Sequence, residues 1–338
     1  MLTEMTAAQE TDLWCPIVVR CAPEAKRRRA HHNAIAWAAD AGLVQDDGQL
    51  AWYSRWNAAE FTARVYSRCE PDEFDLATQW FGWMNVLDDR LESTPLEDLP
   101  AQLAPLTDIF SGTRDPHLTR PQRRTPLSGA LADLWERTRG HMSPAWQGRM
   151  AYLWSQCAEG FLWEARNRLI GRPPSLADYM ARRVEAGGAQ FCLALAEGLY
   201  KEELSEELYY SAPLKMLREC ACEHICWAND VLTLERESAR GDVHNLVLVL
   251  EAAQGIPRSA ALAAAIQMTN DRAHTVLALT ETVIPGYADA KELSPAQRDL
   301  LFRSVDAIEQ WLAGSLEFHR ISTRHVDHRA AGANPFTS

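Results

Sequence analysis

Long segments of helix-forming residues are the feature that most restricts the fold of this chain. Ala, Leu, Glu, Arg and Gln dominate its 338 residues, and these residue types favour helices. We predict helices at about 74–92, 144–168, 175–200, 213–237, 257–285 and 294–318, separated by turn signals such as 171–175 with its two prolines. Only 17–19 and 246–250 have the composition of short strands, and the second continues into helix-forming residues. The sequence therefore predicts an all-α fold.

The chain shows no sign of division into separate modules. It has no visible internal repeat and no Gly/Ser-rich linker, so we expect one α domain over 1–338, with 1–12 and 328–338 as flexible tails. Ser175 and Ser294 are expected N-caps, the latter with Pro295 at the first helical position.

The net charge and the distribution of apolar residues exclude several classes of protein. Asp and Glu (46) outnumber Lys and Arg (34), which gives −12 at pH 7, whereas nucleic-acid-binding surfaces are normally basic. No apolar run reaches the roughly 18 residues that a membrane span requires, and 1–10 lacks the order of a signal peptide. We expect a cytoplasmic protein that binds neither nucleic acid nor membrane.

One group of cysteines could be mistaken for a zinc site. Cys220, Cys222, His224 and Cys226 lie close together in the sequence, but on a helix only Cys222 and Cys226 share a face. Zinc needs four converging ligands, usually from two separated pairs. We therefore interpret the thiols as small buried apolar groups.

An acidic cluster follows a strongly apolar and aromatic segment. Asp88, Asp89 and Glu92 come directly after 80–87, which reads WFGWMNVL. Residues four apart lie on one helix face, so Asp88 and Glu92 share a face. Carboxylates there could hold hard cations at the mouth of an apolar cavity. A solvated helix end is the alternative.

A second polar stripe lies on the helix predicted at 213–237. Asn229, Thr233 and Glu237 are spaced four and four, which places them on one side of that helix. Their amide, hydroxyl and carboxylate oxygens are ligand types that Mg²⁺ accepts. The alternative is an amphipathic helix with an ordinary polar stripe.

Taken together, the two motifs resemble those of bacterial class I terpene cyclases, also called terpene synthases. That family pairs DDxx(D/E) with NDxx(S/T)xxx(K/R)E about 140 residues later, which matches the positions of Asp88 and Asn229 here. Three further segments resemble the family. The first contains Glu164, 171–175, Tyr179 and the Arg182-Arg183 pair, the second is 241–247, and the third contains Trp311 and Arg324-His325. The matches follow the family's order over about 60–325.

The resemblance implies a fold, a substrate and a set of metal ligands. It implies a helical bundle around a central cavity, a prenyl diphosphate substrate, pyrophosphate as product and three Mg²⁺ ions, for which Mn²⁺ can substitute. Asp88, with Asp89 or Glu92, would bind two ions, and Asn229, Thr233 and Glu237 would bind the third. Glu92 and Thr233 stand where the family more often has Asp and Ser.

Cationic residues are implied around the leaving pyrophosphate. The resemblance assigns this role to Arg182, Arg236 and Arg324, and places His325 where the family usually has Tyr. We predict Arg182 as the pyrophosphate sensor, four residues before a helix break, with Arg183 as the alternative. Gly187-Gly188 fits that break because paired glycines favour local unwinding.

The resemblance also implies which residues form the cavity wall. These are Phe81, Trp83, Met84, Asn85, Ala186, Gly187, Phe191 and Trp311, with Trp80 and Trp227 as further aromatic candidates for stabilising a carbocation. Most aromatic residues on helices are packing residues, which is the alternative for each of them. Met84 and Asn85 stand where relatives often carry aromatic residues.

The expected activity is that of a carbon–oxygen lyase that ionises farnesyl diphosphate and cyclises the carbocation to a terpene hydrocarbon or alcohol. Geranylgeranyl and geranyl diphosphate stay open as substrates. A chain-elongating prenyltransferase would need a second aspartate-rich motif, which the sequence lacks. A non-enzymatic helical scaffold is the remaining alternative, and a homodimer is expected only from the habit of the family.

Overall fold

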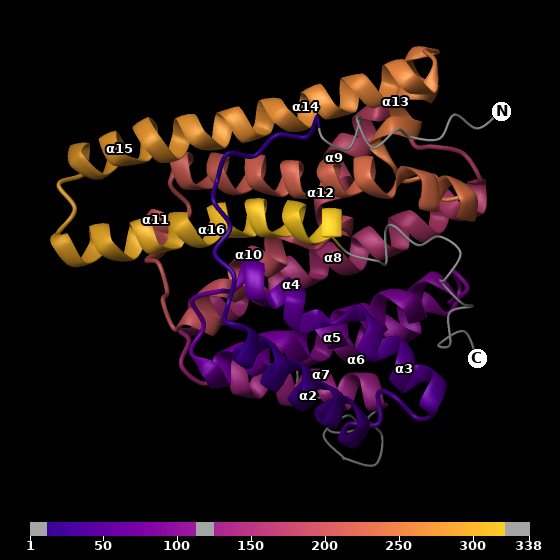
Figure 1. Ribbon diagram of the computed structural model, residues 1–338, viewed down its shortest axis with the longest axis horizontal. Coiled ribbons are helices and arrows are strands. Elements are labelled where there is room, and N and C mark those ends of the chain that lie inside the picture. The colour runs from indigo at the N-terminus through magenta and orange to yellow at the C-terminus, as the bar shows by residue number, and fades with distance from the viewer. Residues whose placement is uncertain (1–11, 113–124, 322–338) are drawn as a thin grey trace.

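The predicted helical segments are helices in the computed structural model, which describes residues 12–112 and 125–321 (Figure 1). The first half of the chain forms α2 (Glu24–Asp40), α3 (Asp47–Trp56), α4 (Ala58–Val65), α5 (Pro71–Glu92), α6 (Leu99–Ser111), α7 (Pro126–Arg139), α8 (Pro144–Ile170), α9 (Leu176–Ala186) and α10 (Ala189–Tyr200). The second half forms α11 (Glu206–Tyr209), α12 (Ala212–Arg240), α13 (Leu246–Gln254), α14 (Arg258–Ala278), the π-helical turn η2 (Leu279–Val283), α15 (Ile284–Ala290) and α16 (Pro295–Ile321).

The prediction of an all-α fold is confirmed. Neither described range contains a strand: 17–19 is irregular and 246–250 begins α13. The two predicted N-caps are present, since the Ser175 hydroxyl accepts from the backbone N–H of Asp178 at 3.1 Å and that of Ser294 accepts from Gln297 at 3.4 Å. Capping satisfies backbone donors that the first helical turn leaves open.

α12 lies at the centre of the helical arrangement. It packs between α14 and α16, which run beside it in Figure 1, and it also contacts α9, α10 and α13. Most residues of α12 from Leu214 to Leu234 are buried, as its apolar composition predicts. The polar stripe of this helix is therefore held inside the molecule.

The segment predicted at 175–200 is two helices, because Gly187 and Gly188 interrupt it. Gly188 has φ +63°, which side chains rarely tolerate, and a Cβ on Gly187 would meet Arg183 Nη1 and Cys226 Sγ at 2.8 Å. A Cβ on Gly160 of α8 would likewise meet the backbone of Ala186 at 2.4 Å. The break therefore packs closely against both α8 and α12.

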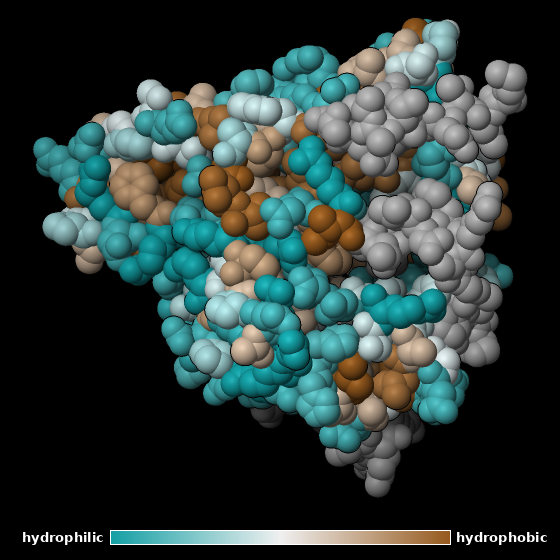
Figure 2. All heavy atoms as spheres, in the orientation of Figure 1, coloured by the Kyte–Doolittle hydropathy of each residue, from teal (hydrophilic) through white to brown (hydrophobic). Residues whose placement is uncertain are grey.

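Most buried apolar residues belong to one continuous core, and a smaller cluster surrounds Leu204, Leu208 and Tyr209. The face of the molecule drawn in Figure 2 is mostly hydrophilic, with hydrophobic side chains gathered in small groups. Among the described residues, no helix is both long and apolar enough to cross a membrane.

Candidate active site

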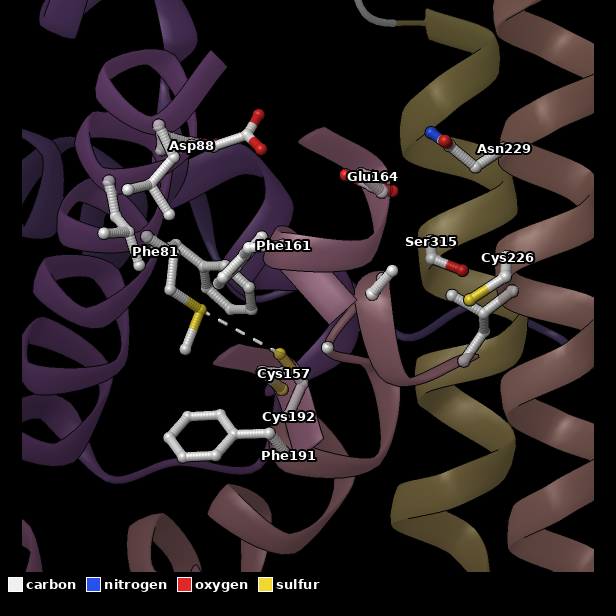
Figure 3. Close-up of a pocket in the computed structure, with 18 of the residues that line it drawn as sticks. Phe81, Asp88, Cys157, Phe161, Glu164, Phe191, Cys192, Cys226, Asn229 and Ser315 are labelled. Atoms are coloured by element: carbon white, nitrogen blue, oxygen red, sulfur yellow. Dashed lines mark hydrogen bonds between the residues drawn. The ribbon is translucent and has the colours of Figure 1, made fainter. Parts of the chain in front are cut away.

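A cavity of about 380 Å³ opens between α5, α8, the α9–α10 break, α12 and α16. This volume lies within the range of roughly 300–1,000 Å³ that is usual for small-molecule sites. In Figure 3, Asp88 and Asn229 stand on opposite sides of the cavity, and Phe81, Phe161 and Phe191 lie deeper inside it. The cavity therefore has a polar end and an apolar end.

Asp88 and Glu92 of α5 both line the polar end, as the shared helix face predicts. α5 is buried over most of its length, and the exposed Asp88 lies in its last turns. Glu92 lies 3.7 Å from the Arg240 guanidinium at the end of α12. The structure thus brings the two acidic motifs to the same opening.

Asp89 does not line this cavity. It is buried on another side of α5, where its Oδ2 accepts a hydrogen bond from the indole N–H of Trp52 at 2.7 Å. Adjacent residues on a helix are rotated by about 100°, and the packing of α5 turns Asp89 toward α3 while Asp88 faces the cavity. Of the two expected partners of Asp88, Glu92 therefore lines the polar end, whereas the Asp89 carboxylate joins α5 to α3.

The second motif forms a connected set of oxygen atoms on α12. The Thr233 hydroxyl donates to Glu237 Oε1 at 2.7 Å and is also 2.7 Å from the backbone carbonyl of Asn229. Asn229 and Glu237 line the cavity, whereas Thr233 lies behind them, almost fully buried. The Asn245 amide donates to Glu237 Oε2 at 2.9 Å. All three predicted residues are therefore brought together at one place.

Burial changes the acidity of Glu237. It raises the pKa of this carboxyl to about 7, with the nearby Asp230 as a further cause, against the hydrogen bonds from Asn245 and Thr233, which lower it. A carboxylate with a raised pKa gains most when a cation arrives beside it. Electrostatically, Glu237 is therefore suited to face a metal ion.

Asp230, the second letter of the N-D pair, holds the polar end together from behind. Its carboxylate accepts from Tyr179, from the Arg183 guanidinium at 2.7 Å and from the backbone N–H of Leu246 at 2.7 Å. The Asn245 amide donates to its backbone carbonyl at 2.6 Å. Asp230 thus ties α9 and α13 to α12, a role that the sequence analysis did not assign to it.

The structure places the two adjacent arginines differently. Arg183 lines the cavity, bonds Asp230 and lies 3.5 Å from the Asn229 amide oxygen. Arg182 is on the outer side of α9, with 43% of its side chain exposed, 3.6 Å from Asp178. The geometry thus favours Arg183, the alternative of the sequence analysis, over Arg182, and the role of pyrophosphate sensor stays a prediction.

The other predicted cationic residues fall into two groups. Arg236 lines the cavity, with its guanidinium 3.7 Å from the Glu237 carboxylate. Arg324 and His325 lie outside the described residues, so their predicted roles stay predictions.

All eight predicted wall residues line the cavity: Phe81, Trp83, Met84, Asn85, Ala186, Gly187, Phe191 and Trp311. Trp80 and Trp227 do not line it. The Trp80 indole donates to Thr138 at 2.9 Å inside the core, and Trp227 packs under the Arg272 guanidinium. For these two tryptophans, the alternative of a packing role holds.

Several wall residues escaped the sequence analysis. Phe61 of α4 makes edge contacts with Phe81, Trp311 and Phe318, with ring centres 4.6, 5.4 and 5.0 Å apart. Along α8, one stripe of residues at helical spacing faces the cavity: Cys157, Phe161, Glu164 and Arg168. Along α16, Trp311 is joined by Ser315, Phe318 and His319. Helical spacing could have identified both stripes, given one known member of each.

Three thiols also line the apolar part of the cavity, namely Cys157, Cys192 and Cys226 (Figure 3). Burial raises the pKa of Cys157 to about 12 and that of Cys226 to about 11. The thiols are therefore uncharged at neutral pH, and it is the thiolate that is the strong nucleophile.

The interpretation of the thiols at 220–226 as buried groups is confirmed. Cys220, Cys222, His224 and Cys226 are buried, and no group of three or more His, Cys, Asp and Glu side chains in the described ranges could hold a metal ion. An ion at the polar end would therefore have to draw on amide and hydroxyl oxygens and on its ligand as well. Mg²⁺ commonly binds in this way, through one or two carboxylates and substrate phosphates.

Known proteins resemble this chain in sequence and in fold. Residues 79–275 match the family model described as terpene synthase family 2, C-terminal metal binding. The chain is 30% identical to a pentalenene synthase of Streptomyces avermitilis over 96% of each chain. It is 29% identical to a (2E,6E)-farnesyl diphosphate cyclizing (+)-T-muurolol synthase of Roseiflexus castenholzii, over 86% of this chain and 87% of that one. The crystal structure of germacradien-4-ol synthase from Streptomyces citricolor has a similar fold, with a TM-score of 0.80 over 92% of this chain and 98% of that one at 24% identity.

Proposed function

Because this chain belongs to terpene synthase family 2, we propose that it ionises farnesyl diphosphate and cyclises the resulting carbocation. As a terpene synthase it is a carbon–oxygen lyase acting on phosphates, and its family implies a divalent metal and a prenyl diphosphate substrate. Farnesyl diphosphate is supported by relatives that are farnesyl diphosphate cyclizing, such as the T-muurolol synthase.

One observation carries the proposal. The described chain places Asp88 on one side of a cavity and Asn229 with Glu237 on the other, and lines the space below them with aromatic and apolar side chains. A substrate with an anionic head and a long apolar tail fits such a divided cavity in one orientation. The diphosphate would lie between α5 and α12, and the isoprenoid chain would extend toward Phe191.

The residues that would hold metal at the polar end have suitable oxygen atoms. Asp88 and Glu92 offer carboxylates from α5, and Asn229, Thr233 and Glu237 offer the mixed set from α12. We propose Mg²⁺, three ions in all, as the cofactor. When bound, these ions supply Lewis-acid stabilisation of the charge that develops on the diphosphate.

The arginines would act on the same leaving group. Cleavage of the allylic C–O bond sends its electron pair to the diphosphate oxygen, so the head gains negative charge as the bond breaks. Arg183 and Arg236 line the cavity at this end, and a planar guanidinium can bind two phosphate oxygens at once. The Arg183–Asp230 ion pair orients one guanidinium before substrate arrives.

The apolar end would hold and shape the carbocation. The faces of Phe81, Phe191 and Trp311 can stabilise a cation by about 0.5–2 kcal/mol each when water is excluded. The neutral thiols there offer no strong nucleophile. The reaction would end by loss of a proton, which gives a hydrocarbon, or by addition of water, which gives an alcohol.

The test is to incubate purified protein with Mg²⁺ and, separately, geranyl, farnesyl and geranylgeranyl diphosphate, followed by gas chromatography with mass spectrometry. We expect a cyclic C15 product and pyrophosphate from farnesyl diphosphate. Turnover of another diphosphate alone would correct the substrate and keep the reaction class. Release of no pyrophosphate from any of the three would refute the proposal.

A matched pair of variants links the result to the site. Glu237→Gln removes a cavity carboxylate, whereas Glu235→Gln changes a carboxylate of the same helix that does not line the cavity. We expect activity to be lost in the first and kept in the second, with both proteins folded. Isopentenyl diphosphate added to the assay checks for chain elongation, which would appear as a longer linear diphosphate. A scaffold without activity would show no thermal stabilisation by Mg²⁺ and pyrophosphate.

A further inference from the structure

His244 is a polar residue of the cavity wall to which the proposed reaction gives no role. It lies between α12 and α13, and only 5% of it is exposed. Its Nδ1 is 3.0 Å from the Asp242 carboxylate, whereas its Nε2 is buried with no hydrogen-bond partner in the described part of the chain. Burying a polar atom without a partner costs free energy. Nε2 is therefore an unfilled hydrogen-bonding position inside the cavity wall, closed to solvent in the ligand-free structure.

The surrounding chain holds this imidazole in place. Gly241 ends α12 with φ +76°, after which Asp242 Oδ1 accepts from the backbone N–H of Val243 at 2.8 Å as well as from the His244 ring. The Trp163 ring packs on His244, with ring centres 5.1 Å apart. The Asn245 side chain then caps α13 by accepting from Val247 at 3.0 Å. The ring is thus positioned by a turn, a carboxylate and an indole.

Carboxyl and guanidinium groups both lie near the ring. Burial would raise the pKa of Asp242, but hydrogen bonds from His244 and the backbone hold it at about 2, so the carboxylate is ionised. An ionised carboxylate beside Nδ1 accepts the Nδ1–H, so donation from Nε2 requires a second proton on the ring, which an anion bound at Nε2 would stabilise. Burial raises the pKa of the neighbouring Glu164 carboxyl, whereas His244, Arg183 and Arg168 lower it. The imidazole therefore shares its surroundings with the Arg183 guanidinium at the polar end of the cavity.

We propose that His244 is a further substrate-positioning residue, which donates a hydrogen bond from Nε2 to the diphosphate of the substrate and to the pyrophosphate product. Asp242 holds the ring in the orientation that this bond requires. The inference rests on the proposed function, since it needs a diphosphate at this end of the cavity. It adds a hydrogen-bonding group from the α12–α13 connection to the groups on α5, α9 and α12.

The direct test is nuclear magnetic resonance of the protein labelled with ¹⁵N histidine, titrated with inorganic pyrophosphate and Mg²⁺. The His244 resonances are identified as those missing in His244→Gln. We expect the Nε2 resonance of His244 to shift on pyrophosphate addition, while those of exposed His32 and His141 stay in place. Pyrophosphate binding, seen by calorimetry, without a shift of the His244 resonance would overturn the inference and leave the proposed function intact. Failure of the parent protein to bind pyrophosphate would overturn both.

Two variants separate the two nitrogens of the ring. In His244→Asn the amide can replace Nδ1 toward Asp242 but does not reach the Nε2 position, whereas the longer side chain of His244→Gln does. We expect pyrophosphate with Mg²⁺ to bind about tenfold or more weakly to the Asn variant, as for loss of a hydrogen bond to a charged group, and the Gln variant to recover part of the loss. The KM for the diphosphate substrate should change in the same order.

A purely structural role predicts another pattern. It would lower the melting temperature of the ligand-free variants and leave the pyrophosphate dissociation constant of the folded fraction unchanged. That result, or equal binding by both variants and the parent, would overturn the inference. His141→Asn serves as the matched control on the exposed surface.

Discussion

The Arg183 guanidinium lies 2.7 Å from the Asp230 carboxylate, and this buried ion pair joins α9 to α12 beside the break at Gly187. Its two residues are separated by 47 positions in the sequence. Asp230 also accepts from Tyr179 and from the first backbone N–H of α13. The helices α9, α12 and α13 are therefore joined through one carboxylate beside the polar end of the cavity.

Loss of that carboxylate should destabilise the fold. Asp230→Asn leaves the buried Arg183 without its counter-charge, and breaking a buried ion pair costs about 3–5 kcal/mol. We expect a decrease of that order in the free energy of unfolding, measured by urea denaturation. Glu136→Gln, which removes an exposed partner of Arg139, should cost no more than about 1 kcal/mol. Equal effects of the two substitutions would contradict the central role given to Asp230.

The two adjacent arginines should differ sharply in their effect on catalysis. Arg183→Gln removes a cavity guanidinium and should lower kcat by about 10²-fold or more, the usual cost of losing a group that stabilises developing charge. Arg182→Gln changes a half-exposed side chain outside the cavity and should leave kcat near that of the parent. Steady-state kinetics on the two folded variants and the parent protein measure the three kcat values. A larger loss in Arg182→Gln would restore the assignment that the sequence suggested.

The Thr233 hydroxyl should matter for metal affinity more than for stability. Thr233→Val keeps the shape of the side chain but removes the hydroxyl, which donates to Glu237 and offers a ligand oxygen. The apparent Mg²⁺ dissociation constant should therefore rise by about 10–100-fold. Thr233→Ser keeps the hydroxyl and should stay close to the parent. Titration of the activity of each variant against Mg²⁺ concentration measures the apparent dissociation constant. An unchanged Mg²⁺ dissociation constant in Thr233→Val would exclude this residue from the metal site.

Mg²⁺ binding should depend on pH through Glu237. The pKa of this carboxyl is about 7 without metal, so below that pH a proton must leave before the ion can bind. The affinity for Mg²⁺ should therefore fall as the pH falls. The apparent Mg²⁺ dissociation constant should rise by up to about tenfold per pH unit below pH 7. The slope should flatten in Glu237→Gln. The Mg²⁺ dissociation constant is measured by calorimetry from about pH 5 to pH 7, where Glu237 is mostly protonated without metal. A constant that does not change with pH in the parent protein would contradict the raised pKa.

Two glycines should respond to alanine in opposite ways. A Cβ on Gly187 would crowd Arg183 Nη1 and Cys226 Sγ, so Gly187→Ala should displace the guanidinium and lower activity. A Cβ on Gly148, within α8, meets nothing within 4 Å, so Gly148→Ala should stabilise the helix by about 0.5–1 kcal/mol. Thermal melts and kcat for both variants test the pair. Full activity in Gly187→Ala would show that the break tolerates a side chain.

The sequence by itself predicted six long helical segments, glycines suited to a break at 187–188 and the two oxygen-rich motifs. The helices α2, α3, α4, α6 and α7 were found only in the structure. Helix propensity, turn residues and spacing of four are local properties, and Asn229, Thr233 and Glu237 are neighbours on α12 wherever that helix lies. The order of the motifs along the chain also indicated the family.

Only the tertiary structure decided which member of each neighbouring pair faces the cavity. Helical periodicity fixes the angle between Arg182 and Arg183, or between Asp88 and Asp89, but the direction of either depends on which helices pack around α9 and α5. The packing turned Asp89 toward Trp52 and placed Trp80 and Trp227 in the core. It also brought His244 to the cavity wall beside Asp242, because the position of the α12–α13 connection is set by long-range contacts with α8 and α9 that no local pattern encodes.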